Sequence, residues 1–187
     1  MKKKKLVYIG LTADTIHHGH INLIESAREY GNIIVGLLTD KAVKDYKRMP
    51  LLTFDQRKKI LINIKGVSKV VKQNDWDYAI NIRKYKPDYM VHGSDWISGP
   101  QLKLRQNAIR ELKKYKGKLI EIPYTKGVSS SALSMEQNKK FTTPETRLKS
   151  LIRLIEAKNF IRIIEAHNPI SALIAENTNL KVKNKFK

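Results

Sequence analysis

Two histidines lie on either side of a glycine at His17, Gly19 and His20, and this spacing could serve phosphate chemistry. Imidazole groups can donate hydrogen bonds to phosphate oxygens while negative charge develops on a departing pyrophosphate. Gly19 would let the backbone approach a phosphate closely, because glycine has no side chain. The motif therefore favours a site for a polyanionic phosphate and nucleotidyl transfer without a covalent step. In the alternative interpretation, the two histidines only cap a helix or lie exposed.

The segments on either side of this motif predict its place in the fold. Residues Leu6–Leu11 are apolar, β-branched and aromatic, as expected for a buried strand. After the motif, apolar residues recur near helical spacing until Gly31, which is a favourable helix stop. The motif would thus join the carboxyl end of a strand to the N-terminus of a helix. Open α/β sheets bind ligands at that edge, where unpaired N–H groups and the helix dipole attract phosphate.

Strand-like runs alternate with helix-like stretches along the chain. The runs are Leu6–Leu11, Asn32–Leu38, 67–72, 88–92 and Lys118–Ile122. This alternation predicts an α/β fold in which helices cover both faces of a five-stranded parallel sheet. Thr53 and Gln56, three residues apart, predict a capping box at the start of one helix. About 135 residues suffice for one compact core of this kind.

Three separated blocks resemble the cytidylyltransferase family typified by the glycerol-3-phosphate and choline-phosphate cytidylyltransferases. The first block is the histidine motif itself, preceded by Asp14. The second is His-Gly-Ser-Asp-Trp at 92–96, and the third is Thr-Lys-Gly-Val-Ser-Ser-Ser at 125–131. The blocks keep the family's order over roughly 120 residues, which is far more specific than a single short motif. The resemblance covers residues 1 to 135 and implies a Rossmann-like nucleotidyltransferase fold.

The resemblance also implies a role for each matched residue. His17, His20 and Lys47 would be catalytic, because they would bind the CTP phosphates and stabilise the transition state. The implied substrate-binding residues are Asp14, Arg57 and Tyr124; for Arg57 the alternative is an ordinary surface residue of a helix. The residues implied to contact CTP are Thr12, Ala13, Gly19, Asp95, Trp96, Thr125, Gly127, Val128, Ser129 and Ser130.

The third block bears on both the triphosphate and the acceptor. Ser129 and Ser130 would open a helix whose N-terminus faces the triphosphate, although an ordinary N-cap cluster would look the same. Tyr124 stands where the glycerol-3-phosphate enzymes have arginine, which makes glycerol phosphate a less favoured acceptor. Ser134 occupies the position of an arginine in related adenylyltransferases, which disfavours adenylyl transfer. Mg²⁺ would be bound through the CTP phosphates, with no metal site made by the protein.

The character of the chain changes after residue 135. We expect domain 1–135, a linker over 136–147 and a second segment over 148–187. Pro144 is placed to open a helix, 160–166 is strand-like, and Asn168-Pro169 predicts the start of another helix. Residues 165–178 resemble the opening strand and helix of phosphoenolpyruvate mutase, whose TIM-type barrel needs about 250 residues. We therefore expect the truncated start of such a barrel, from a longer polypeptide or one completed by another subunit.

The two resemblances together imply a bifunctional protein of phosphonate biosynthesis. The predicted reaction is transfer of CMP from CTP to a phosphonate, first 2-hydroxyethylphosphonate and then 2-aminoethylphosphonate, with release of pyrophosphate. Glycerol-3-phosphate or choline-phosphate cytidylyl transfer is the alternative enzymatic interpretation. An oligomerisation domain without catalysis is a further alternative. The resemblance also implies a homodimer.

The composition limits the other classes of function. Lysine and arginine outnumber the acidic residues by 37 to 17, for a formal net charge of +20. This charge would concentrate anionic substrates and would attract nucleic acid equally well, so nucleic-acid binding is the main non-enzymatic alternative. The chain lacks an arginine-rich arm and an aromatic RNA-binding signature, which makes that alternative less favoured. With no cysteine, no apolar run near the ~20 residues of a membrane span and no signal-peptide core, we expect a cytoplasmic protein.

Overall fold

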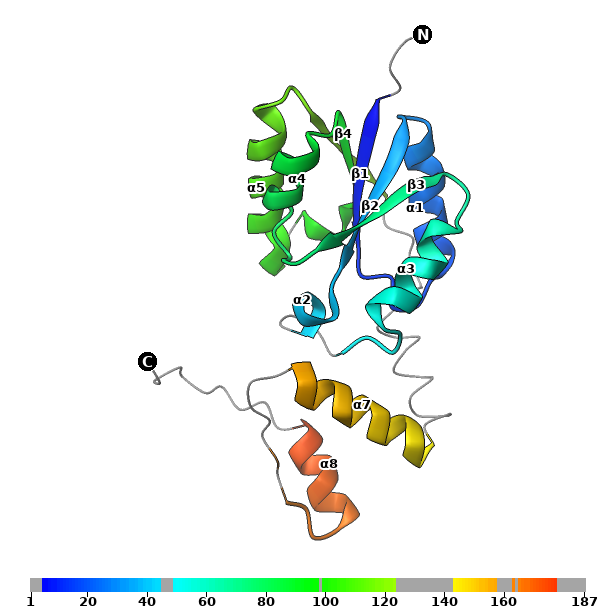
Figure 1. The fold of residues 1–187 in the computed structure, drawn as a ribbon. Coiled ribbons are helices and arrows are strands. Elements are labelled where there is room, and N and C mark those ends of the chain that lie inside the picture. Colours follow the sequence, from blue (N-terminus) through cyan, green and yellow to red (C-terminus); the bar gives the residue numbers. More distant parts are fainter. Residues whose placement is uncertain are drawn as a thin grey trace. The chain divides into compact units, whose positions relative to one another are not determined.

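A parallel β-sheet forms the centre of the larger of two compact units, Met1–Ala157 (Figure 1). The computed structural model describes residues 5–44, 49–97, 99–123, 143–157, 163 and 165–177. The strands are β1 (Leu6–Leu11), β2 (Asn32–Leu38), β3 (Val67–Gln73), β4 (Tyr89–Gly93) and β5 (Lys118–Ile122). Their order is β3-β2-β1-β4-β5, and each neighbouring pair is parallel. The predicted five-stranded parallel sheet is therefore confirmed.

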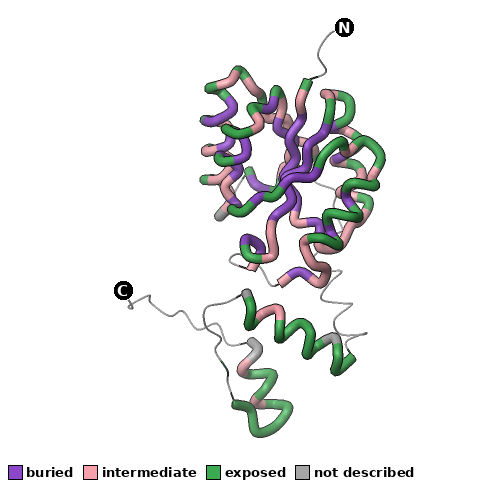
Figure 2. The backbone as a smooth tube through the Cα atoms, viewed as in Figure 1, coloured by how far each residue is buried: buried purple, intermediate pink, exposed green. Residues whose placement is uncertain are grey.

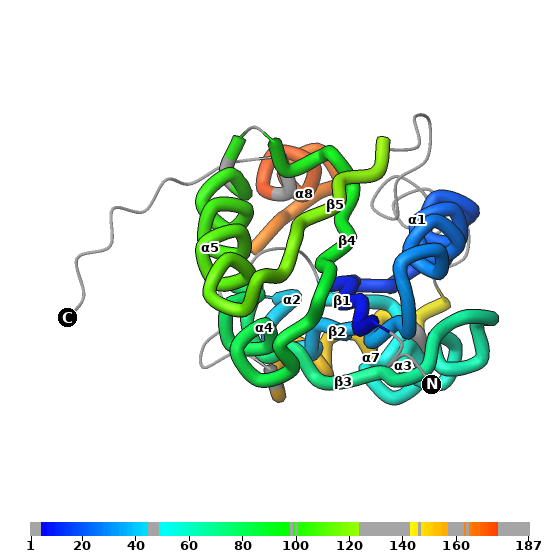
Figure 3. Tube along the Cα trace, turned by 90° about the horizontal axis from the view of Figure 1, so that it is seen from above, coloured from blue at the N-terminus to red at the C-terminus, as the bar shows by residue number. Residues whose placement is uncertain are grey.

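Helices cover both faces of this sheet. The helices are α1 (His18–Arg28), α2 (Asp40–Lys44), α3 (Phe54–Ile62), α4 (Ala79–Tyr85), α5 (Leu102–Lys113), α7 (Pro144–Ala157) and α8 (Pro169–Asn177), with 3₁₀ turns at Ser94–Trp96 and Gly99–Gln101. Helices α1 and α3 pack on one face, and α4 and α5 pack on the other (Figure 3). The chain crosses from one face to the other between β3 and β4. The strand order reverses between β1 and β4, the place where such sheets bind ligands.

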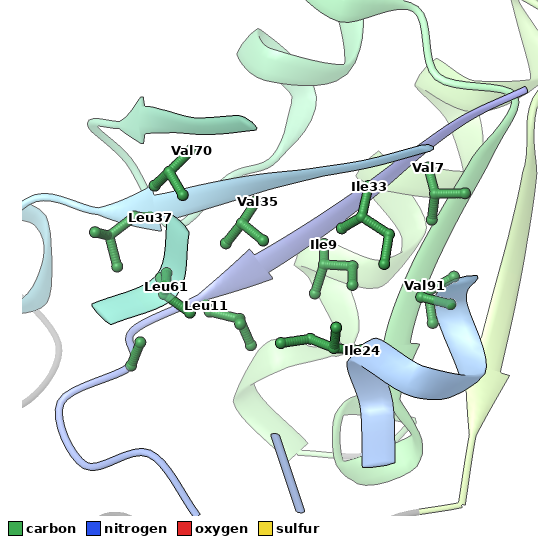
Figure 4. Packing of buried hydrophobic residues seen from close by; sticks show 12 residues of the cluster. Val7, Ile9, Leu11, Ile24, Ile33, Val35, Leu37, Leu61, Val70 and Val91 are labelled. Carbon is green, nitrogen blue, oxygen red and sulfur yellow. The ribbon is translucent and has the colours of Figure 1, made fainter. Parts of the chain in front are cut away.

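The core follows from the alternation of side chains along each strand. Val7, Ile9 and Leu11 of β1 point to the face covered by α1, where they pack with Ile24 (Figure 4). Tyr8 points to the opposite face and packs with residues of α4 and α5. Because the central strands are buried on both faces, they are nearly continuous apolar runs, as parallel strands require (Figure 2).

A buried polar contact explains one glycine of β2. The Tyr8 hydroxyl donates to Gln73 Oε1 and accepts a hydrogen bond of 2.8 Å from Asn81 Nδ2. This hydroxyl lies against Gly36, where an added Cβ would come within 1.7 Å of it. A side chain at position 36 would displace the Tyr8 hydroxyl, so the network requires glycine there.

The predicted domain bounds at residues 135 and 148 stay a prediction. The division between the two compact units falls after Ala157, so α7 belongs to the first unit. Helix α7 begins at Pro144, as predicted. Helix α8 begins at Pro169, also as predicted, and Ser171 N donates to Asn168 Oδ1 at 2.8 Å. The expected strand 160–166 lies largely outside the described residues, and nothing in the described part of the chain shows the start of a TIM-type barrel.

Candidate active site

The two histidines cap helix α1 with their own ring nitrogens. His17 is the N-cap residue, and its Nδ1 accepts a hydrogen bond of 3.2 Å from Gly19 N. His20 Nδ1 accepts one of 3.3 Å from His17 N, which completes a capping box made of imidazoles. With Nδ1 acting as an acceptor in both rings, each neutral imidazole carries its proton on Nε2. The capping contacts therefore leave the Nε2–H groups of the two rings as donors at the start of the helix. The ring centroids lie 4.0 Å apart.

The protonation of His17 is biased toward the neutral form. Burial lowers the pKa of His17, and the neighbouring His18 adds a smaller effect in the same direction. A neutral imidazole still donates through Nε2, so binding of a phosphate oxygen does not depend on prior protonation. Binding of CTP by His17 and His20 stays a prediction. Capping through Nδ1 and phosphate binding through Nε2 are compatible, because they use different nitrogens of each ring.

The loop between β1 and α1 contains an uncommon backbone conformation. Ala13 has a φ of 53°, in the left-handed region, which costs a non-glycine residue roughly 1–2 kcal/mol. Ala13 is buried as a whole residue and belongs to the core, so the expected contact of Ala13 with CTP does not fit its burial. The carbonyl of Thr12 accepts a hydrogen bond from Arg57 Nη1. The loop is therefore held in a definite shape immediately before the histidines.

Asp14 connects this loop to the segment that precedes α3. Its Oδ1 accepts hydrogen bonds from the backbone N–H groups of Leu51, at 2.6 Å, and Leu52, at 3.5 Å. This contact orients the two loops relative to each other. It fits the role in orienting neighbouring residues that the family resemblance implies for Asp14 besides its contact with the substrate.

Arg57 does not occupy the place that the sequence predicted. Its side chain is 0% exposed, so it is neither a surface residue nor able to contact a substrate directly. It donates to three backbone carbonyls, those of Thr12, Leu38 (2.9 Å) and Leu52 (3.2 Å). It also forms an ion pair of 2.6 Å with Asp40 Oδ1. Arg57 therefore holds together the loops that follow β1 and β2 and precede α3.

The second block forms a buried aromatic stack at the end of β4. The rings of His92 and Trp96 lie 3.8 Å apart and nearly parallel. Trp96 is 0% exposed, so the expected contact of Trp96 with CTP does not fit its burial. Its indole Nε1 donates to Glu121 on β5 at 2.8 Å. The side chain of Asp95, in contrast, is 46% exposed and remains available to a nucleotide.

Neighbouring groups fix the tautomer of His92. Its Nδ1 lies 2.8 Å from the carbonyl oxygen of Gly93, which can only accept, so Nδ1 carries the proton. The Tyr78 hydroxyl, 3.2 Å from Nε2, then donates to that nitrogen. Burial lowers the pKa of His92 and outweighs the hydrogen bond to Gly93 and the charges of Asp95 and Glu121. Burial likewise raises the pKa of Tyr78, which keeps the hydroxyl protonated as a donor.

Several residues of the site were missed by sequence reasoning. Arg105 on α5 forms two hydrogen bonds of 2.8 Å with Glu121 and thereby lowers the pKa of that carboxyl group. Asp40, Tyr78 and Arg153 were missed as well. Asp40 alone had a usable signal, because an acidic residue just after a predicted strand lies at the ligand-binding edge.

The remaining predicted residues lie outside the described part of the chain. They are Lys47, Tyr124, Thr125, Gly127, Val128, Ser129 and Ser130. Among the residues that are described, no three His, Asp or Glu side chains gather closely enough to hold a metal ion. No described helix is long and apolar enough to cross a membrane.

We expect the stability of the protein to fall as the pH drops below about 6.5. His17 and His92 both have lowered pKa values, so the folded protein binds fewer protons than the unfolded chain just below that pH. Their contribution is complete above pH 6.5 and is lost progressively on acidification. Urea midpoints at pH 7.5 and pH 5.5 would measure it.

The His92→Gln variant, which cannot titrate at this position, supplies the control for that measurement. Its urea midpoint should change less between the two pH values than that of the unmodified protein. Equal changes in both proteins would show that His92 does not contribute to the pH dependence.

Comparison with solved structures identifies the class of the fold. The structure resembles that of the lipopolysaccharide core biosynthesis protein from Thermoplasma volcanium, with a TM-score of 0.57 and 17% sequence identity. The match covers 66% of this chain and 99% of that chain. At this identity the likeness concerns the fold alone. The fold, with its histidine loop at the carboxyl end of β1, is a Rossmann-like α/β fold.

Comparison of sequences identifies the family. A family model described as cytidylyltransferase-like matches residues 8–136. The chain is 31% identical over 135 residues to the glycerol-3-phosphate cytidylyltransferase of Bacillus spizizenii, covering 71% of this chain and 96% of that protein. It is 32% identical over 122 residues to the ethanolamine-phosphate cytidylyltransferase of Mus musculus, covering 64% of this chain and 29% of that protein. The chain belongs to the cytidylyltransferase-like family and is a CTP-dependent nucleotidyltransferase, as its three sequence blocks predicted.

Proposed function

We propose that this enzyme transfers CMP from CTP to the phosphate or phosphonate group of a small acceptor and releases pyrophosphate. The observation that carries the proposal is the imidazole capping box. His17 and His20 use Nδ1 to cap α1 and keep Nε2 protonated at a helix N-terminus. Two such donors beside a helix dipole are suited to a triphosphate, because the N–H donors and the dipole each favour negative charge.

The proposed reaction is an in-line displacement at the α-phosphorus of CTP. An oxygen of the acceptor attacks that phosphorus, and the bond to the bridging oxygen of pyrophosphate breaks with its electron pair. An acceptor oxygen that is already ionised carries no proton to be removed, so no general base is required. His17 and His20 would donate hydrogen bonds to triphosphate oxygens, which stabilises the charge that develops on the leaving group.

The other predicted residues complete the proposal. Lys47, Ser129 and Ser130 would bind the triphosphate, and Asp95 would lie near the nucleotide, as the family resemblance implies. The high positive charge of the chain would raise the local concentration of both anionic substrates. Mg²⁺ bound to the CTP phosphates would reduce their charge, and it needs no metal site from the protein.

An alcohol phosphate is the acceptor that the relatives favour. The names of the Bacillus spizizenii and Mus musculus proteins give glycerol-3-phosphate and ethanolamine phosphate as their acceptors. Both are small phosphomonoesters, so we propose an acceptor of this kind first. We keep the homodimer as part of the proposal, since the family resemblance implies it.

A phosphonate is the second candidate acceptor. Two sequence observations favour it: Tyr124 replaces the arginine of the glycerol-3-phosphate enzymes, and residues 165–178 resemble the start of a phosphoenolpyruvate mutase. A phosphonate presents the same ionised oxygens as a phosphomonoester, so the chemistry at the α-phosphorus is unchanged. The acceptor would then be 2-hydroxyethylphosphonate or 2-aminoethylphosphonate.

Phosphorus NMR of parallel incubations would test the proposal. The protein is incubated with CTP, Mg²⁺ and one of glycerol-3-phosphate, ethanolamine phosphate, phosphocholine, 2-hydroxyethylphosphonate or 2-aminoethylphosphonate. We expect pyrophosphate together with the phosphoanhydride resonances of a CDP-alcohol or a CMP-phosphonate for one acceptor class. Pyrophosphate formation without an acceptor adduct, or no CTP binding at all, would contradict the proposed transfer.

A further inference from the structure

Helix α7 contacts the candidate active site although it lies beyond the part of the chain that matches the family. The family match ends at residue 136, and α7 begins at Pro144. Arg153 of this helix donates to the carbonyl of Leu51 at 2.9 Å and forms an ion pair of 3.3 Å with Asp40. A longer contact of 3.5 Å joins it to the carbonyl of Leu52. The family resemblance therefore supplies no role for this arginine.

Arg153 completes the anchoring of one backbone segment. The N–H of Leu51 donates to Asp14, from the loop that carries the histidines, and the carbonyl of Leu51 accepts from Arg153. The carbonyl of Leu52 accepts from Arg57. The segment is thus held by Arg57, five residues from Leu52, and by Asp14 and Arg153, which lie 37 and 102 residues from Leu51.

Asp40 links the two arginines. Its Oδ1 pairs with Arg57 at 2.6 Å and its Oδ2 with Arg153 at 3.3 Å. The side chains of Asp40 and Arg153 are 27% and 22% exposed, so this pair is better shielded from solvent than an ordinary surface ion pair. Because Arg57 also binds the carbonyl of Thr12, the contacts connect α7 to the loop immediately before His17.

The apolar residues of α7 do not explain its position. Four of its large apolar side chains are about half exposed, those of Leu148, Leu151, Ile152 and Ile155, and Leu154 is only partly buried. Burial of this stripe therefore contributes little to holding the helix against the first unit. The polar contacts of Arg153 are the specific connection between α7 and the segment at Leu51.

We propose that Arg153 is a positioning residue of the nucleotidyl-transfer site. It holds the segment Leu51–Leu52 against Asp14 and Arg57, and thereby holds the histidine loop in the shape that binds the triphosphate. This inference rests on the proposed function, since that loop is where CTP would bind. It extends the catalytic domain beyond the family match to include α7.

Substitution of Arg153 in the full chain tests this proposal. We expect Arg153→Ala to raise the dissociation constant for CTP about tenfold, the effect of losing roughly one charge-assisted hydrogen bond. The kcat/KM for CTP should fall by a similar factor. The dissociation constant of Arg153→Lys for CTP should lie between those of the unmodified protein and Arg153→Ala. A single ammonium group cannot contact Leu51 and Asp40 with the geometry of a guanidinium.

Lys149→Ala is the matched control. Lys149 lies on the same helix and pairs with Glu145 in an exposed ion pair, without contact to the Leu51 segment. We expect this variant to bind CTP as the unmodified protein does. Addition of about 20 mM guanidinium, far below denaturing concentrations, should partly restore CTP binding to Arg153→Ala alone. A purely structural loss of α7 would not respond to it.

The outcomes separate this inference from the proposed function. If CTP binds but no acceptor reacts, the acceptor is wrong and the CTP affinities still test Arg153. If Arg153→Ala binds CTP as tightly as Lys149→Ala, or is not restored by guanidinium, the role of Arg153 is disproved while the proposed function stands. If the unmodified protein binds no CTP, both proposals fail.

Discussion

The kcat of the His17→Asn variant is expected to be about 10²–10³-fold lower, while the protein remains folded. Asparagine is a favoured N-cap residue, so its Oδ1 can replace His17 Nδ1 as the acceptor for Gly19 N. It has no atom at the position of Nε2 and therefore removes the proposed donor to the triphosphate. The variant thus separates catalysis from helix capping, which an alanine substitution would not do.

His17→Gln supplies the opposite control. The glutamine amide can reach toward the former Nε2 position and donate there, but it lacks an acceptor at the Nδ1 position. We expect a lower melting temperature than for His17→Asn, because a lost cap costs about 1 kcal/mol, together with higher residual activity. Steady-state turnover by phosphorus NMR and thermal unfolding followed by circular dichroism would measure both. A folded His17→Asn protein that keeps more than a tenth of the activity would contradict the assignment of His17.

Replacement of Arg57 is expected to cause the largest loss of stability. Arg57→Met removes a fully buried guanidinium that donates to three carbonyls and to Asp40. These acceptors are then left without their donor, so we expect the free energy of unfolding to fall by about 3–5 kcal/mol. For a domain of ordinary stability, between about 5 and 15 kcal/mol, this is a large fraction.

Urea unfolding at pH 7.5 would measure this loss, with Arg83→Met as the matched control. Arg83 forms an ion pair of 3.2 Å with Glu111, but its side chain is 48% exposed, and Glu111 keeps its pair with Lys114. Because Arg83 is half exposed and the buried Glu111 keeps Lys114 as a partner, we expect a loss of about 1 kcal/mol or less. Arg57→Lys should also be clearly less stable than Arg83→Met, because one ammonium group cannot reach all four acceptors. Equal losses for Arg57→Met and Arg83→Met would refute the structural role of Arg57.

Local patterns predicted the elements of this fold well. The strands over Leu6–Leu11, Asn32–Leu38 and Lys118–Ile122 form with the predicted bounds. Strand β3 ends one residue later than predicted, and β4 begins and ends one residue later. The capping box of Thr53 and Gln56 forms, with Gln56 N donating to the Thr53 hydroxyl at 3.4 Å. These features depend on neighbours in the sequence, so the residues that determine them can be seen together.

The positions of the charged and aromatic side chains were harder to predict. Arg57 was expected at the substrate and Trp96 at the nucleotide, and both are buried, Trp96 within a core cluster. Both carry a polar group that could have faced either solvent or the interior. Which way each points depends on partners elsewhere in the chain, Asp40 for the arginine and Glu121 for the indole.

By itself, the sequence determined the α/β class and the histidine motif at a strand end, because both follow from periodicity or from short spacing. It also indicated the family, through the resemblance of three separated blocks. Only the tertiary structure decided how the loops around that motif are held. Asp14 meets Leu51 across 37 residues, and Arg153 meets the same residue across 102. Contacts between residues so far apart in the sequence produce no periodic pattern, because each needs only one suitable side chain at either end. They form because folding brings the carboxyl ends of parallel strands to one edge of the sheet.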